Sequence, residues 1–173
     1  MRFARVRAFV VVCVLVLVAG VATWIAISKD TQGDGASGAC GGDLIPIETD
    51  PEKIPPLEDI EIVVLNGTDR DGLAETARNQ LEERGFTVVE SDDTEARVDK
   101  SAEVTYGPDQ YLAGLHVKSY FYRGAENFQA DWDKPVTVTV GEGFDQVLRT
   151  DEALRTWSHA SSIDPPKGTC SVD

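Results

Sequence analysis

The residues best suited to bind a ligand are Asn66, Gly67 and Thr68, which follow an apolar run and precede a helical pattern. A corner between the carboxyl end of a strand and the amino end of a helix presents free backbone N–H groups, and α/β proteins often bind ligands there. The same residue types also serve a purely structural turn, with Asn66 and Gly67 forming the corner and Thr68 capping the helix. Because Asp69 and Asp71 would repel a phosphate, the structural turn is the favoured interpretation.

Other reactive residue types form no catalytic or metal-binding pattern in the sequence. His116 and His159 lack Cys or His partners at metal spacing, and no Gly-x-Ser-x-Gly motif occurs. The acidic pairs Glu82–Glu83 and Asp92–Asp93 are typical of solvated surfaces. We therefore expect a protein that is not an enzyme and that has no catalytic residue, no metal and no cofactor. A deep cleft holding two acidic groups would instead favour a small hydrolase or transferase.

Aromatic side chains are the other candidate for ligand contact. The run Tyr120–Tyr122 is expected to lie mostly in the core. Tyr111 or Trp132 could offer a platform for a sugar or a peptide.

The cysteines suggest a covalent link between the two ends of the chain. Cys13 lies inside an apolar segment, whereas Cys40 and Cys170 flank the remainder. If the chain beyond that segment is exported, a Cys40–Cys170 disulfide is chemically permitted. Two unpaired thiols are the alternative, because sequence spacing cannot place the two Cα atoms within the reach of about 7 Å that a bridge needs.

The apolar segment predicts a membrane anchor over residues 8–28. It is uncharged from Ala8 to Ile27 and long enough to cross a hydrocarbon core of about 30 Å. Basic residues precede it, at Arg2, Arg5 and Arg7, so the positive-inside rule places residues 1–7 in the cytoplasm and the rest outside. We expect a single-pass protein of the cytoplasmic membrane.

Two other export signals fit the sequence less well than an uncleaved anchor. A cleaved signal peptide would use the small residues of Gly20–Ala22, but the apolar run continues past them. A lipoprotein fits less well, because Cys40 lies far from the apolar segment and lacks a bulky residue three positions before it.

Residues 29–58 differ in composition from the segments on either side. They are rich in Gly and then in Pro, with acidic residues between, which predicts a flexible tether that becomes more extended toward its end. The whole chain has a formal net charge of -14. Such a charge disfavours nucleic acids and other polyanions as partners.

The folded domain is predicted over residues 59–150 and opens with a strand-helix-strand unit. Strands are expected at 60–65 and 86–90, the first of them buried on both faces. The intervening helix has an apolar stripe that ends at Leu81, close packing at Gly72 and a left-handed cap at Gly85. Such a unit should be parallel and right-handed.

A second strand-helix-strand pattern follows. Strands are expected at 102–106 and 136–140, with a helix that begins at Pro108. One or two short helices are expected around Phe144, Val147, Leu148, Leu154 and Trp157. Residues 151–173 are predicted to be an acidic C-terminal extension, which is loose from Ser158 onward. The fold class is therefore α/β, with α+β possible, in which a mixed sheet of about four to five strands packs with two main helices and follows one transmembrane helix.

Three motifs in this domain resemble a known family. The segments are Val63–Thr68 with Gly72–Ala74, then Leu81–Val88 with its Arg-Gly-Phe exit, then Val104–Pro108. Together they resemble the C-terminal domain of the LytR/CpsA/Psr cell-envelope proteins, in a stand-alone anchored form without the catalytic domain. The resemblance covers roughly residues 58–143.

The resemblance implies a function in the bacterial envelope. It points to an actinobacterial protein with a tethered, non-catalytic scaffold or binding role in wall assembly or maintenance. Its implied partners are the membrane, an envelope protein such as a wall-polymer ligase, and a glycan in the alternative of a peptidoglycan-binding module. The transferase activity of the full ligases is not implied, because the chain has no room for their catalytic domain before residue 60. An exported acidic domain is also not expected to regulate transcription.

Overall fold

The computed structural model describes residues 40–159 and 163–172. The predicted N-terminus (1–7), the predicted anchor (8–28) and the first part of the predicted tether lie outside these residues. Within the described ranges, no helix is both long enough and apolar enough to cross a bilayer. The chain from Gly42 onward forms one compact unit.

The centre of this unit is a mixed sheet with the strand order β3-β2-β6-β4-β5. β2 (Glu61–Asn66) pairs in parallel with β3 (Thr87–Asp93) and also with β6 (Val136–Val140). β6 pairs antiparallel with β4 (Ala102–Tyr106), which pairs in parallel with β5 (Ala125–Phe128). The prediction of a mixed sheet is confirmed. The second strand-helix-strand unit ends with β5 and not with residues 136–140 as predicted, because those residues form β6 between the two units.

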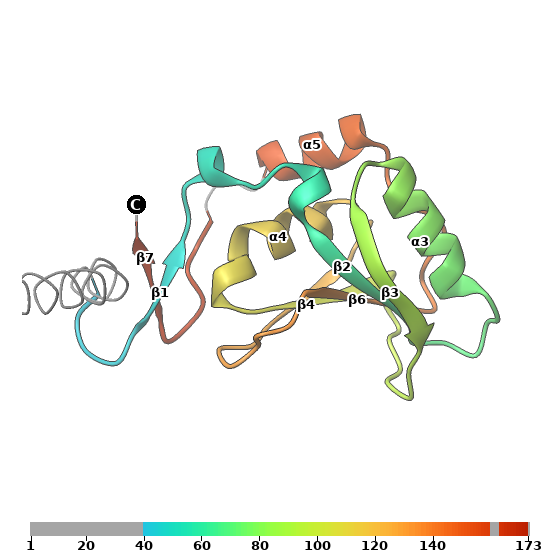
Figure 1. Cartoon of the computed structure of the whole chain (residues 1–173), viewed down its shortest axis with the longest axis horizontal. Coiled ribbons are helices and arrows are strands. Elements are labelled where there is room, and N and C mark those ends of the chain that lie inside the picture. Colours follow the sequence, from blue (N-terminus) through green and yellow to red (C-terminus); the bar gives the residue numbers. More distant parts are fainter. Residues whose placement is uncertain (1–39, 160–162, 173) are drawn as a thin grey trace, which may run out of the picture. The chain divides into compact units, whose positions relative to one another are not determined.

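Three helices lie on one side of this sheet (Figure 1). α3 (Leu73–Glu83) connects β2 to β3, and α4 (Tyr111–Ser119), preceded by the 3-10 turn η3 (Pro108–Gln110), connects β4 to β5. α5 (Thr150–His159) follows β6 and contacts α4. The fold is thus α+β, with the two main helices expected, and α5 contains Leu154 and Trp157, where a short helix is predicted.

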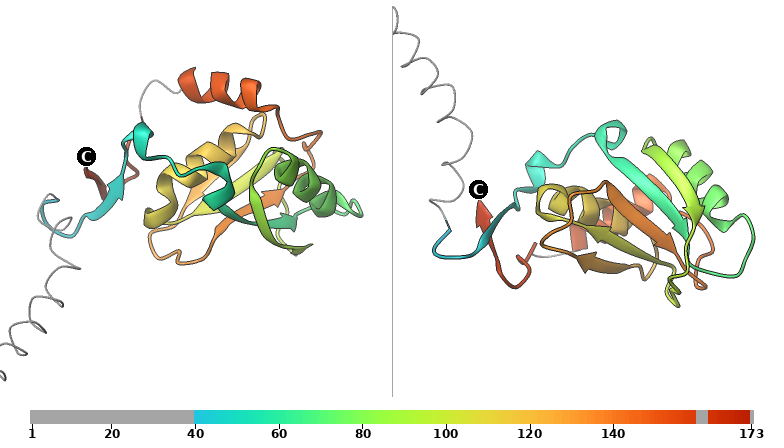
Figure 2. Two further views of the ribbon diagram at one scale, coloured as in Figure 1. Left: turned by 45° about the horizontal axis from the view of Figure 1, so that its top comes forward. Right: turned by 60° about the horizontal axis from the view of Figure 1, so that its bottom comes forward.

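The two faces of the sheet are covered unequally. Ile62 and Val64 of β2 point toward the helices and are fully buried, whereas Val63 and Leu65 on the other face are half-buried. That other face is flanked by the loops after β3 and β5 (Figure 2). The expectation that this strand is buried on both faces therefore holds on one face only.

The start of α3 differs from the prediction. The helix begins at Leu73, its N-cap is Gly72, and no side chain caps it, so Thr68 is not the cap. Gly72 has φ 72°, and a Cβ there would meet no atom within 4 Å. The position therefore needs glycine for its left-handed backbone and not for close packing. Gly85, with φ 99°, confirms the predicted left-handed end.

The two ends of the described chain pair with each other. β1 (Ile45–Glu48) and β7 (Thr169–Val172) form a two-stranded parallel ribbon, in which Pro46 is opposite Cys170 (Figures 1 and 2). Ile47 is almost completely buried in the domain core. Short 3-10 turns η1 (Pro51–Lys53) and η2 (Leu57–Asp59) lead from β1 to the sheet. Parts of the predicted tether and of the predicted loose extension are thus held by this ribbon.

A tight contact between α4 and β4 gives a test of the packing. A Cβ at Gly114 would lie 2.2 Å from two ring atoms of Tyr106, a fully buried side chain. We expect Gly114→Ala to lower the free energy of unfolding by about 1–3 kcal/mol, because overpacking outweighs the better helix propensity of alanine. Urea denaturation measures the loss.

Gly41→Ala is the matched control, since no atom lies within 4 Å of a Cβ at that position. An unchanged or raised stability of Gly114→Ala would contradict the packing of α4 on Tyr106.

Candidate functional site

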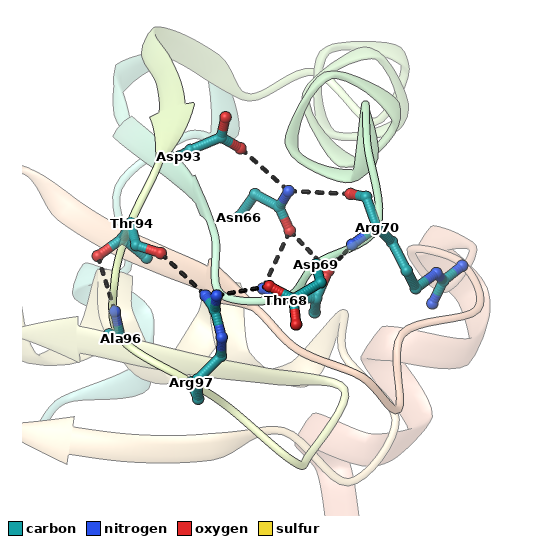
Figure 3. A network of polar contacts seen from close by, with 8 residues as sticks. All are labelled: Asn66, Thr68, Asp69, Arg70, Asp93, Thr94, Ala96 and Arg97. Carbon is teal, nitrogen blue, oxygen red and sulfur yellow. Dashed lines mark hydrogen bonds and ion pairs between the residues drawn. The ribbon is translucent and has the colours of Figure 1, made fainter.

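The corner after β2 is built around the side chain of Asn66, which is 4% exposed (Figure 3). Its Nδ2 donates to the backbone oxygen of Arg70 at 2.9 Å and to Oδ1 of Asp93 at 3.0 Å. Its Oδ1 accepts from the backbone N of Thr68 at 3.2 Å and from Thr68 Oγ1 at 2.8 Å. The amide thus joins β2, the loop before α3 and the end of β3.

Gly67 brings the backbone of this corner against β6. Its N donates to the backbone oxygen of Val140 at 2.8 Å. A Cβ on Gly67 would lie 2.8 Å from Cγ2 of Thr139 and 3.1 Å from the backbone oxygens of Ala96 and Val140. The position therefore requires glycine for its close approach to the central strand.

Two arginines extend the network beyond the corner. The backbone N of Arg70 donates to Thr68 Oγ1 at 3.0 Å, and Arg70 Nη1 donates to the backbone oxygen of Phe144 at 3.2 Å. Arg97 forms an ion pair with Asp69, with Nη2 and Oδ1 2.6 Å apart (Figure 3). Both partners of that pair are exposed, so its contribution to stability is small.

The structure therefore brings together the three residues predicted for ligand binding, and their polar groups bind one another. A backbone N–H that already has an acceptor is not available to a ligand without breaking that bond. The geometry is that of a structural turn, and ligand binding at Asn66, Gly67 and Thr68 stays a prediction.

The cysteines predicted as a pair are both in the disulfide-bonded state. Cys40 is 6% exposed, and Cys170 lies on β7. The pairing of Cys40 with Cys170 stays a prediction.

The structure contains an acidic cleft near η2 and η3, of the kind that would favour a hydrolase if its carboxylates were buried. A cleft of about 420 Å³ is lined by four carboxylate side chains, from Asp59, Glu61, Asp109 and Asp133. All four residues are exposed, so solvent screens their charges. Within residues 40–159 and 163–172, no cluster of three or more His, Cys, Asp or Glu side chains could hold a metal ion.

A second cleft, of about 460 Å³, lies between α4, α5 and the start of β5. We call it the α4–α5 cleft. Its aromatic lining comes from Tyr111, Phe121 and Trp157. Lys118 and Glu126 line it as an ion pair, with Nζ and Oε2 2.7 Å apart.

The sequence indicated only part of this cleft. Tyr111 was one of the two aromatic platforms considered, whereas Trp132 is half-buried and lies outside the cleft lining, with its Nε1 donating to the backbone oxygen of Pro135. Trp157 and the Lys118–Glu126 pair were missed. The contact between α5 and α4 is a long-range one. No local sequence pattern indicates it, so the sequence could not have identified Trp157 and the Lys118–Glu126 pair as lining one cleft.

His116 lies in an aromatic cluster that includes Trp157 of the cleft lining. Its ring centroid is 5.6 Å from that of Trp157 and 5.7 Å from that of Tyr120. Its Nδ1 is buried and has no hydrogen-bond partner among the described residues. Burial lowers the pKa of His116 below its ordinary value of 6.5, so the imidazole is neutral at pH 7.

Comparisons with known proteins add to this geometry. A family described as LytR cell envelope-related transcriptional attenuator matches residues 59–144. The search of curated proteins gave no match.

A solved structure supports the fold. The crystal structure of the soluble domain of a conserved hypothetical secreted protein from Mycobacterium marinum is similar to this chain, with a TM-score of 0.50 and 19% sequence identity. The likeness covers 73% of this chain and 84% of that one. At this identity the comparison shows a shared fold alone.

The Asn66 network predicts the effect of a minimal substitution. In Asn66→Asp, the two hydrogen bonds donated by Nδ2 are lost and a buried carboxylate faces Asp93. We expect the free energy of unfolding to fall by about 2–4 kcal/mol at pH 7. Urea denaturation measures the change.

Asn79→Asp is the control, because Asn79 is exposed on α3 and the same change there should alter stability by less than about 0.5 kcal/mol. If Asn66→Asp were as stable as the control but lost binding to an envelope fraction, the corner would be a ligand site instead.

His116 predicts a pH dependence of stability. Because its pKa is lower in the folded state than in the unfolded state, the unfolded chain binds a proton more readily as pH falls below 6.5. The folded state should therefore lose stability as the pH falls below about 6.5, and His116→Gln should remove that part of the loss. Thermal unfolding of both proteins across this range gives the difference. Identical pH profiles would show that the histidine is not buried as described.

Proposed function

From the premise that residues 59–144 form a LytR C-terminal domain, we propose that this chain is an extracytoplasmic binding or scaffold domain of the bacterial cell envelope, tethered to the cytoplasmic membrane and without catalytic activity. The match to this family is the observation that carries the proposal. It spans both strand-helix-strand units and ends at Phe144, after β6.

Two physical features support a binding role outside the cytoplasm. The net charge of -14 disfavours DNA as a partner, despite the word transcriptional in the family's description. Two disulfide-bonded cysteines are typical of proteins in oxidising compartments. We extend the proposal to a Cys40–Cys170 pairing, a single transmembrane anchor over residues 8–28, an actinobacterial source and a role in wall assembly or maintenance.

A non-catalytic role is supported by how the polar side chains are used. The best candidate site, at Asn66, directs its hydrogen bonds into the fold. The carboxylates of the acidic cleft are exposed to solvent. A scaffold needs neither an activated nucleophile nor a tuned acid.

In-cell photocrosslinking of the full chain tests the proposal. A photoreactive amino acid would replace Val89, which is 50% exposed on the edge strand β3, or Tyr122, which is 67% exposed after α4. We expect crosslinks to envelope proteins, wall-polymer ligases among them, because an exposed strand edge and an exposed aromatic are common contact surfaces.

The same photoreactive residue at Leu57, which is half-buried against the core, is the control for background capture. Two outcomes would contradict the proposal. One is capture of cytoplasmic proteins alone. The other is turnover of a wall precursor by the purified full chain that Asp109→Asn or Asp133→Asn abolishes.

A further inference from the structure

We propose that the α4–α5 cleft binds a neutral saccharide of one or two sugar units. This inference rests on the proposed envelope location, and it names the class of ligand that the domain would meet there. A volume of about 460 Å³ is within the range of small-ligand sites.

The cleft offers an aromatic wall. Trp157 on α5 is half-buried, so part of the indole is accessible, and Tyr111 and Phe121 form the base with less than 5% of each residue exposed. The C–H groups on one face of a pyranose ring can pack against such rings in the same way as an apolar side chain does.

The polar lining combines donors with acceptors. Lys118 and Glu126 form an ion pair but remain 34% and 50% exposed at the side chain, so each has capacity for further hydrogen bonds. Tyr111 Oη donates to the backbone oxygen of Asp164 at 2.9 Å, which leaves its lone pairs to accept. Burial raises the pKa of Tyr111, so the phenol keeps its proton. A sugar hydroxyl both donates and accepts, and it matches such a lining.

The charges of the cleft favour a neutral ligand. Two cations, Lys118 and Arg123, line it together with two carboxylates, Glu126 and Asp164. These charges cancel, while the chain as a whole repels polyanions. A free carboxylate or ammonium ligand would meet attraction and repulsion in equal number.

One residue of the cleft lining, Arg123, has a strained backbone. Arg123 has φ 58°, the only non-glycine residue with positive φ in the described part of the chain. Such a conformation costs on the order of 1 kcal/mol and often accompanies a ligand-binding segment. It holds the guanidinium of Arg123 over the ring of Tyr122, 5.3 Å from the ring centroid.

Calorimetry of the full chain, in a detergent without a sugar headgroup, tests the inference. The probes are a disaccharide of N-acetylglucosamine and maltose, with a capped tetra-alanine peptide and inorganic phosphate for comparison. We expect a dissociation constant of about 1 mM for at least one sugar and no heat with the peptide or phosphate.

Two variants remove different parts of the site. Trp157→Ala should weaken sugar binding about 2- to 12-fold through loss of the aromatic wall, and Glu126→Gln about 2- to 12-fold through loss of a charged acceptor. Glu126 is exposed, so its variant stays folded even if Trp157→Ala does not. Leu154→Ala is the matched control on α5, since Leu154 is 51% exposed and outside the cleft lining, and it should bind as the parent does.

Absence of heat with both sugars would overturn the inference, as would sugar binding that neither Trp157→Ala nor Glu126→Gln weakens. Binding of the peptide in place of the sugars would also overturn it and would assign the cleft to a protein partner. None of these results affects the crosslinks expected at Val89 and Tyr122, so failure of the saccharide site is distinguishable from failure of the proposed scaffold role.

Discussion

The structure depends on the insertion of β6 between two strand-helix-strand units. Val136–Val140 pairs in parallel with β2 and antiparallel with β4, so one strand satisfies the inner edges of both units. Backbone hydrogen bonds extend the pairing past its carboxyl end, from Gly67 N to Val140 O at 2.8 Å and from Gly141 N to Ser101 O at 3.0 Å. Without this strand, each unit would be a two-stranded sheet with an unpaired inner edge. Because β6 is separated from β2 by some 70 residues of chain, its pairing is a long-range contact, whose formation carries a loop-closure entropy that contacts within one unit avoid in part.

The position of α5 follows from both units and not from its own sequence. Gln80 Oε1 on α3 accepts from Val147 N at 2.7 Å, and Arg84 Nε donates to Leu148 O at 3.0 Å. Leu148 N donates in turn to the backbone oxygen of Tyr120 at 2.9 Å. The segment before α5 is therefore fixed to the ends of α3 and α4. The α4–α5 cleft takes its shape from these long-range bonds, so disturbance of the core would also disturb the cleft.

Local patterns were enough to predict most of the sheet. Alternation gave β4 and β6 with their exact bounds, and the left-handed Gly85 marked the end of the first helix. β5 has only four residues, which is too short for a clear alternating pattern. β1 and β7 pair with each other although they lie at opposite ends of the domain's sequence, so no local pattern distinguishes them from loops. Register is set by partners that are distant in sequence, which periodicity cannot report.

The same distinction applies to the candidate site. Asn-Gly-Thr was correctly recognised as a turn, since these residue types act through hydrogen bonds to their own neighbours. Thr68 as a helix cap was wrong because Gly72, with φ 72°, starts the helix in its place. Whether Thr68 forms a turn or caps the helix depends on the residue at which α3 begins. That position is set by the packing of α3 on β2 and β3.

Hydrogen-bonding capacity separates the corner from the cleft. At the corner, the N–H groups of Gly67, Thr68 and Arg70 all have acceptors within the protein. A strand-to-helix corner can bind an anion through such groups, but here they stabilise the junction of β2 with β6. Lys118 and Glu126 differ, because one bond between them leaves further donors and acceptors facing solvent. Recognition of a polar ligand requires this unused capacity, and so the cleft, and not the corner, is the better place for a binding function in this fold.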